Sequence, residues 1–123
     1  RSPSLARTRT AQSCAMATTP CPWDAFGCIR CINLKSRPDR KERVLSSFRG
    51  VGLADRVRFY HPERSPHGGI FGACESHFIV IKEAYESGEP TLVVFEDDVI
   101  FHKGWEAVLT DATAFMQTND TWE

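Results

Sequence analysis

Three adjacent acids, Glu96, Asp97 and Asp98, directly follow the apolar run TLVVF. Buried carboxylates are unfavourable unless they are paired or bind a cation, so acids at the end of a core strand require an electrostatic partner. Ligands of open α/β sheets bind outside the carboxyl ends of the strands, and Mg²⁺ takes one or two carboxylates together with substrate phosphates. The sequence therefore predicts a divalent-metal site here. The alternative is that these acids are exposed turn residues or helix caps.

The order of the three acids predicts the side of the strand to which each carboxylate points. Side chains alternate along a strand, so Glu96 and Asp98 are expected on one side and Asp97 on the other. The face with Glu96 and Asp98 can therefore hold a metal while Asp97 has a different role.

Basic residues gather directly after the first apolar run and continue into a segment with helical periodicity: Lys35, Arg37, Arg40, Lys41 and Arg43. Arginine side chains and helix amino termini both suit phosphate oxygens, and this segment is expected at the same sheet edge as the acids. The alternative is a solvated helix face that pairs with Asp39 and Glu42. We favour that alternative for Lys41 and Arg43, and both interpretations stay open for Arg37 and Arg40.

The glycine-rich segment GGIFGACESHF leads into a second helical pattern. It matches neither the dinucleotide-binding nor the P-loop motif, but glycines before a helix allow the backbone to approach a ligand closely. Ser76 and His77 are neighbours that point about 100° apart on a helix, so they do not form a nucleophile and base pair. His77 lies on the apolar stripe. We expect a core histidine that hydrogen-bonds to the loop or to the acidic strand.

Other candidate ligands are weaker. Cys28 and Cys31 form a CxxC, but within a strand they point to opposite faces, and no second pair with zinc-site spacing is present. His61 and His67 have no partner at ligand spacing, so neither receives a role.

The elements that must position these residues follow from periodicity and from breakers. Strands are predicted over 27–34, 57–60 and 91–95, helices over about 38–49, 73–87 and 105–117, and a loop over 62–72. Ser36 with Asp39 suggests a capping box, and Pro38 suits the first helical turn. The alternation of strands and helices predicts an α/β sandwich with a mainly parallel sheet.

Composition restricts the function classes. A chain of 123 residues with 41% hydrophobic and 25% charged residues is expected to form one ordinary domain. A net charge of -1 gives no field that would attract nucleic acid or an anionic membrane. No apolar run approaches a membrane span and no secretory signal is visible. The five cysteines are an odd number, which favours reduced thiols. A cytoplasmic location is therefore favoured.

The first residues have a different composition from the rest. Residues 1–22 are rich in Ser, Thr, Ala and Arg and are not expected to build a core, so the predicted domain covers 23–123. The segment is interpreted as disordered, as resembling a transit peptide, or as spurious sequence before a start at Met16. The last of these is slightly preferred.

The order of three motifs adds a family resemblance. CINLKSRPDRKERV, GIFGACESHFIVIKEAY and TLVVFEDDVIF follow one another over roughly residues 28–105, and together they resemble glycosyltransferase family 25. This family contains bacterial lipooligosaccharide and animal procollagen galactosyltransferases. The resemblance implies a GT-A-like, Rossmann-type three-layer sandwich that is incomplete at the C-terminus. It also implies a UDP-sugar donor and Mn²⁺ or Mg²⁺ held by an acidic motif.

The resemblance implies roles for individual residues. Asp98 would be the main metal ligand, with Glu96 as its companion or as a ribose contact, and Asp97 on the sugar or structural side. The remaining nucleotide-sugar contacts would be Asn33, Leu34, Arg37, Asp39, Arg40, Gly72, Ser76 and His77. The family's G-C-x-x-S-H order is altered here, because Cys74 follows Gly72 by two positions.

The implied activity is transfer of a hexose, galactose being one candidate, from a UDP-sugar to a hydroxyl of a glycan or protein acceptor. A GT-A domain normally needs more than 200 residues, so the acceptor site and the catalytic base are expected beyond Glu123, and no catalytic residue is assigned. One alternative is an inactive nucleotide-sugar-binding or interaction module. A second is a metal-dependent phosphohydrolase. The first strand is not followed by the DxD motif that would support this alternative.

Overall fold

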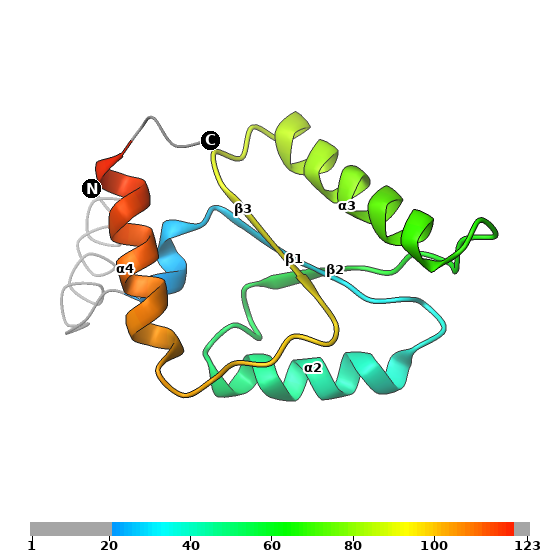
Figure 1. Cartoon of the computed structure of the whole chain (residues 1–123), viewed down its shortest axis with the longest axis horizontal. Coiled ribbons are helices and arrows are strands. Elements are labelled where there is room, and N and C mark those ends of the chain that lie inside the picture. Colours follow the sequence, from blue (N-terminus) through cyan, green and yellow to red (C-terminus); the bar gives the residue numbers. More distant parts are fainter. Residues whose placement is uncertain (1–20, 120–123) are drawn as a thin grey trace, which may run out of the picture.

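The computed structural model describes residues 21–119. Strands and helices alternate along the chain (Figure 1). In order the elements are η1 (Pro22–Ala25), β1 (Cys28–Ile32), α2 (Pro38–Gly50), β2 (Val57–Tyr60), α3 (Gly69–Glu86), β3 (Leu92–Glu96) and α4 (Trp105–Thr118). The α/β class predicted from the sequence is confirmed.

The sheet has three parallel strands in the order β2-β1-β3. Ile32, at the end of β1, pairs with Tyr60 of β2 and with Glu96 of β3. The carboxyl ends of the strands are therefore level with one another, and the predicted parallel sheet is confirmed.

One face of the sheet carries the main core. Ile29 and Cys31 of β1 pack with Val44 and Phe48 of α2 in one buried cluster. Burying such side chains is the dominant favourable contribution to folding, at roughly 25 cal/mol per Å² of apolar surface. This core fixes α2, and hence the start of α2, relative to the end of β1.

Trp23 joins η1 and α4 to this core, which the sequence patterns did not predict. Its indole is almost fully buried and donates a hydrogen bond to the Val51 carbonyl at 2.9 Å. It also stacks on Trp105, with 5.4 Å between ring centroids. Cys21 packs against the same cluster, so the expectation that residues 1–22 stay outside the core is wrong for this position, and Pro22 begins η1. The rest of that segment lies outside the described residues.

The opposite face of the sheet is covered by α3 (Figure 1). Val80 and Ala84 are buried there, and so is the charged Arg30 of β1. Arg30 donates to Glu83 of α3 at 2.9 Å and to the Arg58 carbonyl at 3.2 Å. A buried charge needs such partners, so this ion pair links α3 to the sheet in one orientation.

Two local predictions are wrong. α3 begins at Gly69 and not at residue 73, so part of the predicted 62–72 loop is helical. Glycine has a low helix propensity, but Gly72 also lies close to the preceding loop, since a Cβ there would stand 3.0 Å from the Ser65 Cβ. The capping box of α2 is also absent: its N-cap is Arg37, and no side chain caps the helix.

Within residues 21–119, no helix combines the length and the apolar character needed to cross a membrane.

Candidate functional site

The order of the strands places the candidate site. In the sheet, β2 lies on one side of β1 and β3 lies on the other. The connection after β1 therefore leads to one side of the sheet, and the connection after β2 leads back past β1 to the opposite side, so the strand order reverses between β1 and β3. In open α/β sheets such a reversal leaves a crevice outside the carboxyl ends of the two strands, where ligands bind. The segments that follow β1 and β3 are those that carry the basic cluster and the acidic run.

A cavity of about 310 Å³ opens at this point. It collects nine of the eleven predicted site residues: Leu34, Arg37, Arg40, Gly72, Ser76, His77, Glu96, Asp97 and Asp98. Asn33 and Asp39, both predicted as nucleotide contacts, do not line it.

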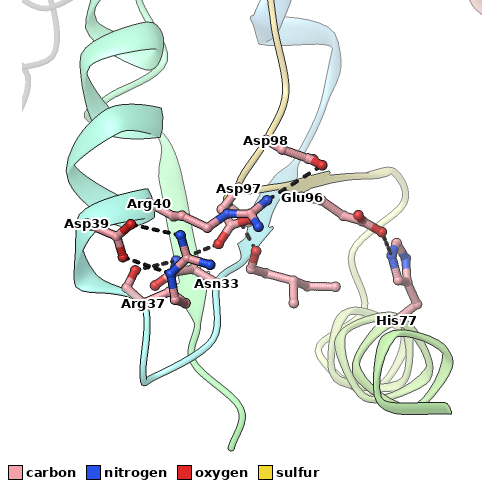
Figure 2. Close-up of polar contacts among 10 residues, drawn as sticks. Asn33, Arg37, Asp39, Arg40, His77, Glu96, Asp97 and Asp98 are labelled. Atoms are coloured by element: carbon pink, nitrogen blue, oxygen red, sulfur yellow. Dashed lines mark hydrogen bonds and ion pairs between the residues drawn. The ribbon is translucent and has the colours of Figure 1, made fainter. Parts of the chain in front are cut away.

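Arg40 joins the basic and acidic groups of the cavity (Figure 2). Its Nη2 atom lies 2.8 Å from Asp97 Oδ1 and 3.6 Å from Asp98 Oδ2. The Asp97 side chain is 11% exposed and that of Asp98 is 67% exposed. Asp97 is therefore an internal partner of Arg40, whereas Asp98 presents its carboxylate to the cavity and to solvent.

Asn33 fixes the position of Asp97 through a hydrogen bond outside the cavity lining. Its Nδ2 atom donates to Asp97 Oδ2 at 2.6 Å and to the Arg37 carbonyl at 3.1 Å (Figure 2). The amide is almost fully buried, so the contact predicted with a nucleotide is replaced by a structural one. Asn33 supports the site without lining it, because it is the first residue after β1 and its side chain points under the turn into α2.

His61 continues this network, although the sequence assigned it no role. Its Nδ1 atom lies 3.1 Å from both the carbonyl oxygen and Oδ1 of Asn33. Both oxygens only accept, so Nδ1 carries the proton. The imidazole also stacks on Phe59, with 5.5 Å between centroids. The residue after β2 thus fixes the residue after β1, which in turn fixes Asp97 after β3.

Arg37 and Asp39 form a second, more open pair. The guanidinium donates to both Asp39 oxygens, at 2.9 and 2.8 Å. These hydrogen bonds hold the pKa of the Asp39 carboxyl well below its ordinary value, and the same bonds raise the pKa of Arg37. Asp39 is outside the cavity but orients Arg37, which lines it.

His77 is not the core residue that its place on the apolar stripe predicted. Its side chain is 37% exposed, and it lines the cavity because α3 passes over the carboxyl end of β3. Its Nε2 atom lies 3.1 Å from Glu96 Oε1, so the predicted hydrogen bond to the acidic strand is confirmed. A carboxylate accepts, so Nε2 carries the proton.

The division of the acids differs from the predicted one. Glu96 turns to His77 on α3, whereas Asp97 and Asp98 both contact Arg40 on α2 (Figure 2). The strand ends at Glu96 and the following residues form a turn, in which the Val99 N–H bonds to the Glu96 carbonyl at 3.2 Å. Strand alternation therefore does not extend to Asp98.

The acids fit a hard cation only in part. Within residues 21–119 no group of three or more His, Cys, Asp or Glu side chains could hold a metal ion. Asp98 and Glu96 nevertheless offer exposed carboxylate oxygens in the cavity, the donor type that Mg²⁺ and Mn²⁺ prefer. Because Mg²⁺ typically completes its shell with water and substrate phosphates, two carboxylates suit a cation that arrives with its substrate.

The cysteines near the site are not placed as nucleophiles. Cys31 lies beneath the acidic run, and burial raises the pKa of its thiol to about 12, with the charges of Asp97, Asp98 and Glu96 adding to the effect. Cys28 is also buried, and its sulfur accepts a hydrogen bond from Arg58 at 3.7 Å. The four cysteines in the described part of the chain are free.

Apart from the two glycines of GGIFGACESHF, sequence reasoning missed one wall of the cavity. The loop after β2 and the start of α3 contribute Pro62, Glu63, Arg64, Ser65, Gly68 and Gly69. Gly68 adopts a φ of 103°, which favours glycine and lets the chain turn into α3. The rule that ligands lie beyond the carboxyl ends of parallel strands, applied to β2 as well as β3, would have found this loop.

Comparisons with protein-family models, with curated proteins and with solved structures give no match. The function is therefore argued from the cavity. Its lining combines guanidinium groups, carboxylates and the first turn of a helix, a combination suited to a phosphorylated ligand accompanied by a divalent cation.

Proposed function

We propose that this chain binds a nucleoside diphosphate sugar, specifically a UDP-hexose, together with Mn²⁺ or Mg²⁺, and transfers the hexose to a hydroxyl acceptor. The observation that carries the proposal is the cavity at the strand-order reversal, where Glu96 and Asp98 face Arg37 and Arg40. The assignment to a GT-A-like fold belongs to this proposal. It is supported by the parallel β2-β1-β3 sheet and by the resemblance of the three motifs to family 25.

The basic side of the cavity would hold the diphosphate. Guanidinium groups donate paired hydrogen bonds to phosphate oxygens. Arg37 forms an ion pair with Asp39, and Arg40 forms one with Asp97, so each guanidinium has a carboxylate that fixes its position. Preorganised donors lose less conformational entropy on binding. The free N–H groups in the first turn of α3, at Gly69, would add to the anion site.

The acidic side would hold the cation. Asp98 is the main candidate ligand because its carboxylate is the most open of the three, and Glu96 is its companion. A bound divalent ion would neutralise charge on the leaving diphosphate as a Lewis acid. Asp97 keeps Arg40 in place and is not assigned to the metal.

A second candidate function is a nucleotide-sugar-binding module that does not catalyse transfer. In the described range, every acid that lines the cavity lies against a basic or N–H-donating side chain: Glu63 by Lys35, Glu96 by His77, and Asp97 and Asp98 by Arg40. To act as the base for an acceptor hydroxyl, any of these carboxylates would have to give up such a contact. The pairing supports binding more directly than it supports catalysis.

The test is calorimetric titration of Mn²⁺ and UDP into the protein and into Asp98→Ala. The matched control is Asp111→Ala, which removes an exposed acid from α4, away from the cavity. We expect Asp98→Ala alone to lose Mn²⁺-dependent UDP binding. Equal binding by all three proteins, or binding by none, would refute the site. Where binding is present, release of hexose from UDP-hexose distinguishes the transferase from the binding module.

A further inference from the structure

The outward side of α3 carries an apolar stripe. Large side chains along it are exposed, Ile70 by 86% and Tyr85 by 84%, and the full stripe consists of Ile70, Phe71, Cys74, Phe78, Ile81 and Tyr85. These positions recur at spacings of three and four residues, so they form one continuous strip on the helix. The opposite side of α3 is the buried one, with Ser76, Val80 and Ala84 against the sheet.

Figure 1 shows α3 over the sheet with no other described element on its outer side. A contiguous apolar strip of this length is uncommon on the surface of a monomeric domain and marks an interaction surface. The stripe borders the cavity, which α3 lines through Gly69, Gly72, Ala73, Ser76 and His77, because His77 is three residues from Cys74 and four from Ile81.

Charged residues run along one flank of the stripe. Glu75 and Lys82 are seven residues apart, two helical turns, so they share this flank. When two identical helices pack antiparallel about a twofold axis, the residues of one flank face residues of the same flank in the other copy. An axis midway between Glu75 and Lys82 passes beside Phe78. It places Glu75 opposite Lys82 of the second copy, and Lys82 opposite Glu75.

We propose that α3 pairs antiparallel with α3 of a second copy of this chain, forming a twofold-symmetric dimer. Phe78 contacts its counterpart at the axis, Ile81 and Cys74 pack beside it, and two identical Glu75–Lys82 pairs close the flank. Closed twofold interfaces are self-complementary, and this stripe has that property in both its apolar centre and its charges. A parallel pairing would instead place Glu75 level with Glu75. The proposal does not depend on nucleotide binding.

The first test is the mass of the protein in solution by sedimentation velocity over a range of concentrations. We expect a dimer for the wild-type chain, a monomer for Phe78→Glu, and a dimer for Phe115→Glu, which changes an exposed phenylalanine of α4 in the same way. Phe78 is two-thirds exposed, so its substitution is not expected to unfold the chain, and circular dichroism checks this. A monomeric wild-type chain, or a dimer that persists in Phe78→Glu, overturns the proposal. A monomeric wild-type chain would leave the stripe to a different protein.

Charge reversal tests the register. Glu75→Lys and Lys82→Glu should each weaken the dimer about tenfold, because each converts two attractive pairs per dimer into repulsive ones. The double variant restores both pairs and should restore the affinity. Additive weakening in the double variant would overturn the antiparallel register.

Cross-linking gives an independent measurement. In the proposed register the two Cys74 residues stand about 13 Å apart along the helix axis, beyond the reach of a disulfide, whereas two residues at position 78 are adjacent. Mild oxidation should therefore link Phe78→Cys in a Cys74→Ser background, and should form no link through Cys74 in the native chain. Efficient linking through Cys74, or none through position 78, contradicts the proposal.

Discussion

Replacing Arg40 by glutamine should have opposite effects on the two halves of the proposed ligand. Arg40 occupies the position of a cation between Asp97 and Asp98, and its Nη2 atom lies 3.6 Å from the more open Asp98. A divalent ion bound to Asp98 would meet this positive charge. The variant Arg40→Gln removes the charge and keeps a side chain that can still hydrogen-bond to Asp97.

The magnitude follows from the geometry. A metal to oxygen distance of about 2.1 Å places the cation roughly 5 Å from the guanidinium. Repulsion between a double and a single positive charge at that distance is about 1.5 kcal/mol with the dielectric constant of water, and larger in a drier site. The Asp98 side chain is 67% exposed, so the smaller value applies. Mn²⁺ should therefore bind Arg40→Gln about tenfold more tightly than wild type when no nucleotide is present.

With UDP present the effect should reverse, because the variant lacks one of the guanidinium groups proposed to hold the diphosphate. Mn²⁺ binding is measured by electron paramagnetic resonance of the free ion and UDP binding by calorimetry. The control is Arg43→Gln, which removes the same charge from the same helix without lining the cavity. Equal or weaker Mn²⁺ binding by Arg40→Gln without UDP would refute competition between Arg40 and the metal. If no protein binds Mn²⁺, the metal site itself is refuted.

Two further predictions concern the groups behind the cavity. Asn33→Ala removes the buried amide that donates to Asp97 and to the Arg37 carbonyl, so urea unfolding should show a loss of about 1–3 kcal/mol. Asn119→Ala removes an amide whose hydrogen bonds are exposed at the end of α4 and should cost less, so equal losses would contradict the role of Asn33. Asp39 has a lowered pKa in the folded state, so its contribution to stability is present above the ordinary carboxyl pKa of about 4 and is lost as the pH falls below it. Asp39→Asn should therefore be less stable than wild type at pH 7 and converge with it in strong acid, and a difference that grows below pH 4 would contradict the pairing with Arg37.

Local patterns were sufficient to predict most of the elements. Apolar runs bounded by Pro90 and by the acids, and helical periodicity between Pro38 and Gly50, correspond to β3 and α2 in the structure. These signals are local because the side-chain period of a strand or a helix appears in the pattern of apolar residues within the element itself. The parallel sheet and the edge that carries the site followed from the same patterns.

Predictions at the ends of elements were less accurate. α3 begins four residues before the predicted start, and Arg37, the N-cap residue of α2, bonds through its side chain to Asp39 and caps no backbone group. The buried Arg30 likewise has its carboxylate partner, Glu83, in a different element. Residue type alone does not show whether such a partner is within reach.

The sequence was enough to predict that acids and arginines would meet at the carboxyl edge of a parallel sheet. It did not assign the acids to their partners. Asn33 and Asp97 are 64 residues apart in the chain and bond at 2.6 Å, and this contact makes Asp97 an internal anchor and Asp98 the open carboxylate. Strand alternation predicted the directions of these side chains wrongly because the strand stops at Glu96. The directions of the next two side chains are set by Asn33 and Arg40, which belong to other segments. Contacts of this kind exist only after the sheet has brought the ends of its strands together.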